Sequence, residues 1–388
     1  MNPALIKRVV AGHSEKFGGA PAAAAYAPGR IEVLGNHTDY NEGFVLSAAI
    51  SSGLCAAAGL RGGKKCFLAA LDLGETAEFE LPVSGPLEKP HWANYLVGVA
   101  GLLAKEGRLE EGFSLAFAGD VPRGAGLSSS AALEVAAAMA LGKLYSIRLS
   151  KIQMARLCQK AENEFTGAKC GLLDQISSIY GKEDHLVFTD FRTLAVENDP
   201  VGKEVCFLMA NTRVKHSLVE SDYNERRAAC EKAAAYFASV LAHPVKALRD
   251  VSSDELNNKS SGLDPVILRR AKHIIGENER VLKARGLLQA GRMKEFGKLM
   301  FASHESSRVN FENSCPELDF IVETAAGMKE VLGARLSGGG FGGSAVLLVN
   351  PKDISAVKTK IISAYAGRFG SSCSIEIARS SAGAALLP

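Results

Sequence analysis

A short polar cluster follows an arginine near the start of the chain, in the segment APGRIEVLGNHTDYNEG. Arg30 opens this segment, and an asparagine, a histidine, a threonine, an aspartate and a tyrosine fill positions 36–40. An amide both donates and accepts hydrogen bonds, whereas an ionised carboxylate such as that of Asp39 accepts several. The cluster is too polar in its middle to be only a strand, and it predicts a binding site for a small polar ligand.

A glycine-punctuated loop leads into an alanine-rich segment at residues 121–135, VPRGAGLSSSAALEV. The start of a helix presents several backbone N–H groups and the positive helix end to one point, which suits phosphate. The serines at 128–130 add hydroxyl donors, and one of them can ligate magnesium. The alternative is a simple helix N-cap by Ser128 or Ser129. A cap needs one serine, not three behind a Gly-x-Gly, so phosphate binding is favoured, although the Walker A pattern is absent.

A second glycine-rich stretch, LSGGGFGGSAVLLV at residues 336–349, contains a literal G-x-G-x-x-G. A dinucleotide fingerprint should follow a strand and open a helix, whereas a strand-like run follows here. This context favours a flexible loop between two strands, lying against a ligand or against the other lobe.

Alternating strand-like and helical runs must position these three segments. Apolar periodicity predicts strands at 31–34, 45–50, 114–118 and within 185–199, and helices at 128–145, 152–165, 222–242 and across 265–304. The helix at 128–145 is apolar nearly all round and should therefore be buried. Strands and helices mixed in both halves predict an α+β fold. We place a domain boundary near residue 195, giving lobes 1–195 and 196–388.

Bulk composition describes an ordinary globular protein of 388 residues with 47% hydrophobic and 22% charged residues. The net charge of +3 argues against a nucleic-acid partner held by a broad basic field. No uninterrupted apolar run reaches the roughly 18–20 residues that a membrane span needs, and the start resembles an amphipathic helix rather than a signal peptide. Eight irregularly spaced cysteines, without CxxC, predict reduced thiols and a cytoplasmic location.

The three motifs, in this order, resemble the signature segments of the GHMP small-molecule kinases and, more narrowly, those of the galactokinases. Supporting segments such as AENEFTGAKCGLLDQISSIYG and RVKHSLVESDYNERR extend the resemblance over nearly the whole chain, from about residue 27 to 349. The resemblance implies two lobes with the active site in the cleft between them. It also implies ATP and Mg²⁺, and phosphoryl transfer to the anomeric hydroxyl of a hexose.

The resemblance further implies roles for individual residues. Asp174 matches the catalytic aspartate and Arg30 its partner arginine. Magnesium would be held by Ser130 and Glu162. The sugar would be contacted by Asn36, His37, Asp39, Gly171, Asp174 and Tyr223, and the nucleotide by Gly124, Gly126, Leu127, Ser128, Ser129, Ser130 and Trp92, with Asn94 and Tyr95 near the nucleoside.

The chemistry of the Asp174 and Arg30 pair suits phosphoryl transfer, in which catalysis is mainly positioning and neutralisation of charge. A guanidinium beside Asp174 favours the ionised carboxylate and makes it a weaker base. A loose transition state tolerates this, because little deprotonation of the nucleophile is needed until late. We therefore expect Asp174 to orient the hydroxyl and accept its proton late, and Arg30 to stabilise charge. The alternative is that Asp174 is an ordinary carboxylate at a helix start. The residues that flank Asp174 match the galactokinase segment, which favours the catalytic interpretation.

Asn36 departs from the pattern, because galactokinases usually read GEHTDY with a glutamate here, directed toward C6 of the sugar. An amide removes the repulsion that a carboxylate would exert on a C6 carboxylate and can also donate. Galactose is the expected substrate, and a C6-altered sugar such as galacturonate is the alternative. Arg213 and Lys215 could supply a positive partner for such a carboxylate.

A catalytically silent sugar and ATP sensor is a further alternative, but such proteins tend to lose the phosphate loop or the aspartate, and both are present here. The sequence leaves C2 specificity open. A monomer is slightly favoured, with a small sugar and ATP as the partners and neither nucleic acid nor membrane. The last residues, SSAGAALLP, have no predicted role.

Overall fold

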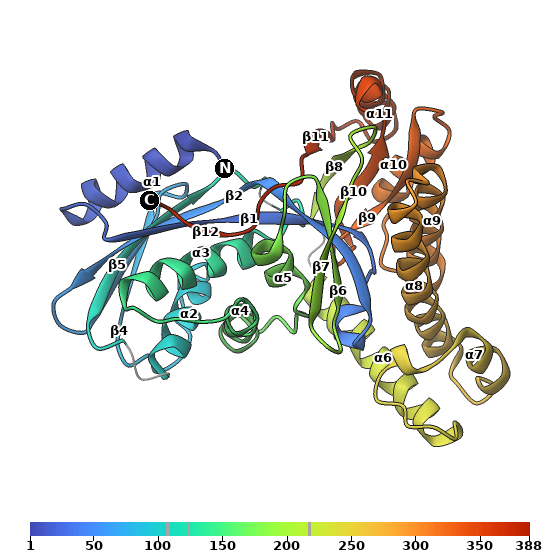
Figure 1. Ribbon diagram of the computed structural model, residues 1–388, viewed down its shortest axis with the longest axis horizontal. Helices are drawn as coiled ribbons and strands as arrows, with labels where there is room; N and C mark the ends of the chain where they lie inside the picture. Colours follow the sequence, from blue (N-terminus) through green and yellow to red (C-terminus); the bar gives the residue numbers. More distant parts are fainter. Residues whose placement is uncertain (106–108, 123, 216–218) are drawn as a thin grey trace.

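The chain folds around two β-sheets in a computed structural model that describes residues 1–105, 109–122, 124–215 and 219–388 (Figure 1). In this part of the chain the larger sheet has eight strands in the order β12-β1-β2-β5-β3-β4, with β6 paired to β2 and β7 paired to β6. Its strands are β1 (Ala23–Leu34), β2 (Phe44–Arg61), β3 (Lys65–Ala70), β4 (Glu75–Glu80), β5 (Gly112–Gly119), β6 (His185–Asp190), β7 (Ala195–Pro200) and β12 (Ala385–Leu386).

Helices cover both faces of the larger sheet (Figure 1). They are α1 (Pro3–Phe17), α2 (Ala93–Lys105), α3 (Ser129–Leu144), α4 (Lys151–Phe165) and α5 (Leu173–Tyr180). The central helix is α3, which packs on β1 and β2 and touches α2, α4 and α5. Its small apolar side chains allow this close approach on every side, which confirms the predicted buried helix. A capping box starts α4, where Ser150 accepts from the backbone of Gln153.

The smaller sheet has the strand order β11-β8-β10-β9 among the described residues. Its strands are β8 (Cys206–Lys215), β9 (Val331–Ser337), β10 (Gly342–Val349) and β11 (Ser374–Ala378). The helices of this half are α6 (Val219–Val240), α7 (Ser253–Lys259), α8 (Pro265–Gln289), α9 (Met293–Ser306), α10 (Pro316–Ala326) and α11 (Ile354–Phe369). The long α8 lies beside α9, and α9 packs on β9 (Figure 1).

The predicted secondary structure is confirmed at each segment named from the sequence, and the α+β class holds. The glycine-rich stretch at 336–349 forms the connection between β9 and β10, with a strand and not a helix after it. Parts of the chain beyond residue 195 stay with the larger sheet: β7 pairs with β6, and β12 pairs with β1. The two-lobe division at 195 therefore stays a prediction, since the sheets themselves part between β7 and β8.

The C-terminal tail returns to the larger sheet, so both termini lie in the same half of the molecule (Figure 1). The hydroxyl of Ser381 donates to the carbonyl of Ile50 at 2.7 Å, and the N–H of Gly383 donates to the carbonyl of Gly181 at 2.7 Å. These contacts give the tail, which had no predicted role, the function of tying down the end of α5.

The two halves meet where the end of β1 crosses β9. The backbone N–H of Glu32 donates to the Ser337 hydroxyl at 2.9 Å, and the Arg335 guanidinium pairs with the Glu32 carboxylate at 2.8 Å. Both charged side chains are almost completely buried. A buried ion pair of this kind fixes register, because breaking it leaves an unpaired charge.

None of the described helices is both long and apolar enough to cross a membrane. All eight cysteines are free thiols, as the irregular spacing predicts.

Candidate active site

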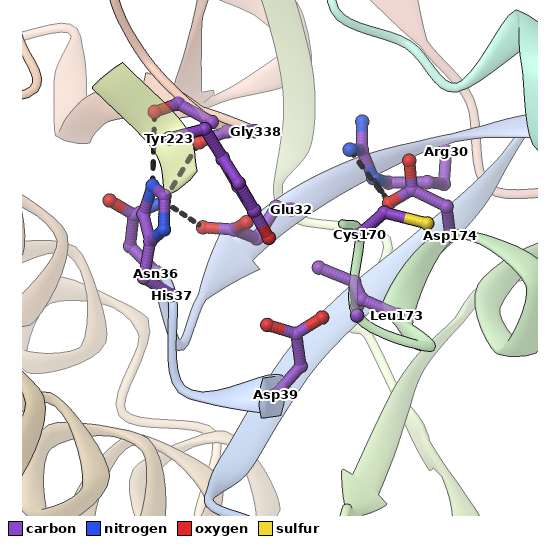
Figure 2. Close-up of a pocket in the computed structure, with 12 residues that line it drawn as sticks. Arg30, Glu32, Asn36, His37, Asp39, Cys170, Leu173, Asp174, Tyr223 and Gly338 are labelled. Atoms are coloured by element: carbon purple, nitrogen blue, oxygen red, sulfur yellow. Dashed lines mark hydrogen bonds and ion pairs between the residues drawn. The ribbon is translucent and has the colours of Figure 1, made fainter. Parts of the chain in front are cut away.

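A cavity of about 210 Å³ lies where β1, α5, α6 and the β9–β10 connection converge (Figure 2). All seven residues predicted to act on or bind the acceptor line it: Arg30, Asn36, His37, Asp39, Gly171, Asp174 and Tyr223. The other lining residues are Glu32, Cys170, Leu173, Gly338 and Gly339. Segments almost 310 positions apart in sequence thus build one site.

Arg30 and Asp174 form an ion pair at one side of the cavity. The Arg30 Nε and Nη2 atoms both donate to Oδ1 of Asp174, at 2.9 and 2.8 Å, and hold that oxygen in place. The Ser128 hydroxyl donates to the other oxygen, Oδ2. Although Asp174 lies in the first turn of α5, its carboxylate makes these contacts and does not cap the helix.

Ser128 bears on one of the two interpretations of the serine loop, the simple helix N-cap. It precedes α3 with a left-handed backbone (φ 57°), and its side chain makes no capping hydrogen bond to the helix. The simple N-cap alternative is therefore wrong for Ser128, whose hydroxyl is directed to Asp174. This contact joins the predicted phosphate loop to the predicted catalytic carboxylate.

Asp39 and Gly171 lie against each other. A β-carbon added to Gly171 would lie 1.6 Å from Oδ2 of Asp39, so the position tolerates only glycine with the carboxylate in its present place. Burial is the main reason that the pKa of Asp39 is raised to about 7, and the nearby Glu32 and Asp174 carboxylates add to it.

His37 is enclosed by the aromatic rings of Tyr40, Tyr223 and Phe311, with centroids 4.6–5.7 Å from its own. Its Nε2 donates to the carbonyl of Gly339 at 3.0 Å, so Nδ1 is the atom that accepts from the Tyr40 hydroxyl at 2.8 Å. Burial lowers the pKa of His37 to about 4, which keeps the ring neutral near pH 7.

The Asn36 side chain is completely buried, and protein groups engage both of its polar atoms. Nδ2 donates to Oε1 of Glu32 at 3.0 Å and to the carbonyl of Gly338 at 2.8 Å. Oδ1 accepts from Nδ2 of Asn313 at 2.9 Å and from the hydroxyl of Ser307 at 3.3 Å. The bonds to Glu32 and Gly338 are drawn in Figure 2. The amide thus cross-links β1, the η3 turn (Ser307–Phe311) region and the β9–β10 connection. A direct role in sugar contact stays a prediction.

A second cavity of about 500 Å³ lies on the other side of the serine loop. Trp92, Tyr95, Ser129 and Ser130 line it, together with apolar residues of β2, β5 and α3. The serine loop therefore lies between the two cavities: Ser128 donates to Asp174, which lines the first, and Ser129 and Ser130 line the second. The predicted nucleoside segment fits this place only in part, because the Asn94 amide is bonded to both backbone groups of Leu87.

A left-handed backbone explains two glycines of the predicted phosphate loop. Gly124 and Gly126 both have positive φ, near 68° and 70°. The carbonyl of Gly126 accepts from Arg30 Nη1, and the carbonyl of Leu127 accepts from the Arg30 backbone. The loop predicted to hold phosphate is thus fixed to the same arginine that holds Asp174.

The donor set near Ser130 suits a hard cation such as magnesium. The Glu162 carboxylate lies beside the Ser130 hydroxyl, and its Oε2 accepts from Nε2 of Gln175 at 3.0 Å. Burial, with the Asp174 charge, raises the pKa of Glu162. Oε1 of Glu134 and Oε1 of Gln175 are buried close by without any hydrogen-bond donor among the described residues. Unpaired acceptor oxygens and crowded carboxylates are the ligands that Mg²⁺ prefers, so the residues present fit the predicted metal.

The β9–β10 connection closes over the serine loop. Gly338 has φ 84°, and a β-carbon there would lie 3.3 Å from the carbonyl of Gly126 and 3.5 Å from Arg30. The Ser344 hydroxyl donates to the carbonyl of Ala125 at 2.7 Å. The expectation that this loop lies against the other lobe is confirmed.

Three buried polar residues of the site had not been singled out from the sequence: Glu32, Glu134 and Gln175. An acidic residue in the middle of an apolar strand, two positions after Arg30, was a readable signal for Glu32. By contrast, Arg213 is exposed on β8 and does not line the cavity, and the side chain of Lys215 lies outside the described part.

Comparison with known proteins gives a consistent picture. The chain matches the family models "GHMP kinases N terminal domain" at residues 94–182, "Galactokinase galactose-binding signature" at 11–60 and "GHMP kinases C terminal" at 284–367. It is 41% identical over 350 residues to a galactokinase of Haemophilus influenzae (strain PittEE), covering 89% of this chain and 90% of that protein. It is 38% identical over 361 residues to the galactokinase of Glaesserella parasuis serovar 5, covering 92% of each.

Solved structures agree with this result. A Lactococcus lactis galactokinase crystallised with galactose superposes with a TM-score of 0.93 at 33% identity, over 98% of this chain and 99% of that one. Mevalonate kinase of Methanococcus jannaschii shares the fold, with a TM-score of 0.62 at 17% identity over 93% and 99% of the two chains. The chain therefore belongs to the galactokinase family of the GHMP kinases.

Proposed function

We propose that this protein transfers the γ-phosphoryl group of ATP to the anomeric hydroxyl of galactose. One observation carries the proposal: Ser128 of the serine loop donates directly to Asp174 in the sugar-sized cavity. A hydroxyl bound beside Asp174 and a phosphate bound at the serine loop would therefore be neighbours, which is the positioning that phosphoryl transfer needs.

In this proposal the C1 oxygen of the sugar forms a bond to the γ-phosphorus while the bond from that phosphorus to the bridging oxygen breaks. ADP leaves with the electron pair, and the hydroxyl proton passes to Asp174. Arg30 holds Oδ1 of the Asp174 carboxylate through two donors, and Ser128 holds Oδ2. The Arg30 guanidinium also offsets the negative charge of the phosphoryl group. Because Arg30 is buried, water does not screen the positive charge of its guanidinium.

The N-terminal end of α3 adds a second positive contribution. The backbone N–H groups at the start of this helix would donate to the phosphates, and Ser129 and Ser130 line the second cavity beside them. Magnesium would be held by Ser130 and Glu162 and, when bound, would neutralise charge on the phosphate oxygens. Trp92 and Tyr95 would contact the nucleoside in the second cavity.

The acceptor site is built for a neutral sugar. Glu32, Asp39 and Asp174 all line the cavity, and Arg30 is the only cationic side chain among the described lining residues. Both polar atoms of the Asn36 amide are already bonded to protein, so Asn36 offers no free donor to a C6 carboxylate. This observation favours galactose over the alternative acceptor galacturonate.

A silent sensor is disfavoured because Asp174, Arg30 and the serines make the contacts that transfer requires. A monomer in the cytoplasm completes the proposal, since free thiols suit a reducing compartment.

A coupled assay of ADP formation tests the proposal. Magnesium-ATP would be offered with galactose, galacturonate, glucose, N-acetylgalactosamine or L-arabinose, and the product identified by ³¹P NMR. We expect galactose to give the highest kcat/KM and galactose 1-phosphate as product. Asp174→Asn should lower kcat roughly 10²–10⁴-fold, the usual contribution of a positioned acid or base. Binding of galactose and ATP without turnover would instead identify a sensor.

A further inference from the structure

Glu32 is a carboxylate inside the acceptor cavity to which the sequence motifs assign no role. It lies on β1 two residues after Arg30, and side chains at i and i+2 of a strand share a face. Figure 2 shows its carboxylate in the cavity between Asn36 on one side and the Arg30–Asp174 pair on the other. Its side chain is only 3% exposed.

The two oxygens of Glu32 have different surroundings. Oε1 accepts from Nδ2 of Asn36 at 3.0 Å and from Nη1 of Arg335 at 2.8 Å. Oε2 accepts no hydrogen bond from any described residue. Oε2 is not among the fully enclosed polar atoms that lack a partner in the described part of the chain. Because the carboxylate lines the cavity where the sugar would bind, Oε2 is open to a hydroxyl there.

We infer that Glu32 determines specificity for the acceptor: its Oε2 accepts a hydrogen bond from one sugar hydroxyl other than the anomeric one, and Asn36 and Arg335 are positioning residues that orient it. The inference rests on the proposed function, because it names the group that reads the sugar in that same site.

Asn36 suits the positioning role because its hydrogen-bonding capacity is already fully used. An amide offers two N–H donors and one carbonyl oxygen, and all of them are used by protein partners here. To bind a sugar hydroxyl directly, Asn36 would have to give up one of these buried bonds. Glu32 needs no such exchange, since Oε2 is free.

Arg335 completes the arrangement from β9. Its guanidinium is fully buried, and Nη1 reaches both Oε1 and the backbone carbonyl of Glu32. Burial raises the pKa of Glu32, and the Arg335 and Arg30 charges oppose that rise. A hydroxyl donating to Oε2 would further favour the ionised form. Asn36 and Arg335 thus hold the Glu32 carboxylate in position before the sugar binds.

The experiment compares galactose with its 2-, 3-, 4- and 6-deoxy analogues in the wild type, Glu32→Gln and Glu32→Met. The wild type should reject the analogue that lacks the partner hydroxyl by roughly 10²–10⁴-fold in kcat/KM, because a buried acceptor is then left unpaired. Glu32→Met should reduce that one ratio to below about tenfold, chiefly through KM for galactose. Glu32→Gln keeps an acceptor and should restore part of the discrimination.

Glu277→Gln is the matched control. Glu277 is a second fully buried carboxylate, and it accepts from the backbone N–H of Gly35 and Asn36 but lies outside the cavity. This variant should lower stability and leave all four deoxy-sugar ratios unchanged. Loss of Glu32 leaves Arg335 unpaired, so the charge-balanced double variant Glu32→Met/Arg335→Met repeats the test if the single variants do not fold.

Unchanged ratios for all four analogues in the Glu32 variants would overturn the inference, as would a wild type that rejects none of them. Failure of the proposed function is distinguishable, because galactose itself would then not be phosphorylated by the wild type.

Discussion

Gly171 lies directly against the carboxylate of Asp39, so close that a β-carbon at 171 would fall 1.6 Å from Oδ2. The contact joins the loop before α5 to the polar cluster after β1. The absence of a side chain at Gly171 thus leaves room for the Asp39 carboxylate, which is predicted to bind the sugar.

We therefore expect Gly171→Ala to displace Asp39 and to lower kcat/KM for galactose by about tenfold or more, with most of the effect in KM. Gly286→Ala is the control, since Gly286 lies in α8 with open space around its would-be β-carbon. Alanine there should leave activity unchanged and raise the free energy of unfolding by up to about 1 kcal/mol. Steady-state kinetics and denaturant unfolding measure both, and full activity of Gly171→Ala would contradict the assigned role of Asp39.

Ser128→Ala separates positioning of Asp174 from helix capping. Because the Ser128 hydroxyl donates to Asp174 and makes no capping bond, the variant should lower kcat by about tenfold with little change in Tm. Ser150→Ala removes a true N-cap and should cost about 1 kcal/mol of stability without changing kcat. If Ser128→Ala instead lost stability and kept its kcat, the contact with Asp174 would have no catalytic meaning.

Galacturonate should be a poor acceptor. Two like charges about 4 Å apart repel by roughly 4 kcal/mol at an effective dielectric near 20, and the cavity already holds the carboxylates of Glu32, Asp39 and Asp174. We expect its kcat/KM to lie at least about 100-fold below that of galactose. A higher kcat/KM for galacturonate than for galactose in the same coupled assay would contradict the expected electrostatic repulsion.

Asn36→Glu should destabilise the protein, because it places a second carboxylate within hydrogen-bond distance of Oε1 of Glu32. We expect a loss of about 2–4 kcal/mol, in the range for an uncompensated buried charge. The double variant Glu32→Gln/Asn36→Glu again has one carboxylate and one amide, and it should recover much of that loss. Chemical denaturation of the wild type, Glu32→Gln, Asn36→Glu and the double variant gives the coupling energy between the two positions. Purely additive effects would refute the proposed pairing.

The buried His273 should make the protein less stable in acid. Its Nε2 donates to the carbonyl of Asn36 at 3.1 Å, and burial lowers its pKa to about 3. Below pH 6.5 the unfolded chain binds a proton at this position that the folded protein does not, so stability falls by about 1.4 kcal/mol per pH unit. The raised pKa of Asp39, about 7, acts in the opposite direction.

A His273→Gln variant isolates this contribution. It keeps an N–H donor for Asn36 but has no titrating group, and the opposing effect of Asp39 is common to both proteins and cancels. The free energy of unfolding measured between pH 6.5 and 4 should depend on pH less steeply in the variant, by about one proton. Equal slopes in the two proteins would show that His273 titrates normally.

Prediction from the sequence was strongest where chemistry follows from a local pattern. The serine loop before α3 and the polar cluster after β1 are short segments with a distinctive order of residue types, and Arg30, Asp39 and Asp174 do line one cavity. Prediction was weaker for Ser128, because a serine before a helix is normally an N-cap. The sequence does not reveal that the backbone of Ser128 is left-handed. Prediction missed Glu32, since a single acidic residue in a strand does not reveal what packs against it.

Local patterns in the sequence predict the alternation of strands and helices, the burial of α3 and the resemblance to galactokinases, because these depend on residues close together along the chain. Which polar atoms remain available to a ligand depends on the folded arrangement. The polar atoms of the Asn36 amide are hydrogen-bonded to Gly338, Ser307 and Asn313, all more than 250 positions away. Oε2 of Glu32, by contrast, accepts no hydrogen bond from a described residue. Hydrogen-bond saturation is a property of neighbours in space, and only the folded chain brings those neighbours together.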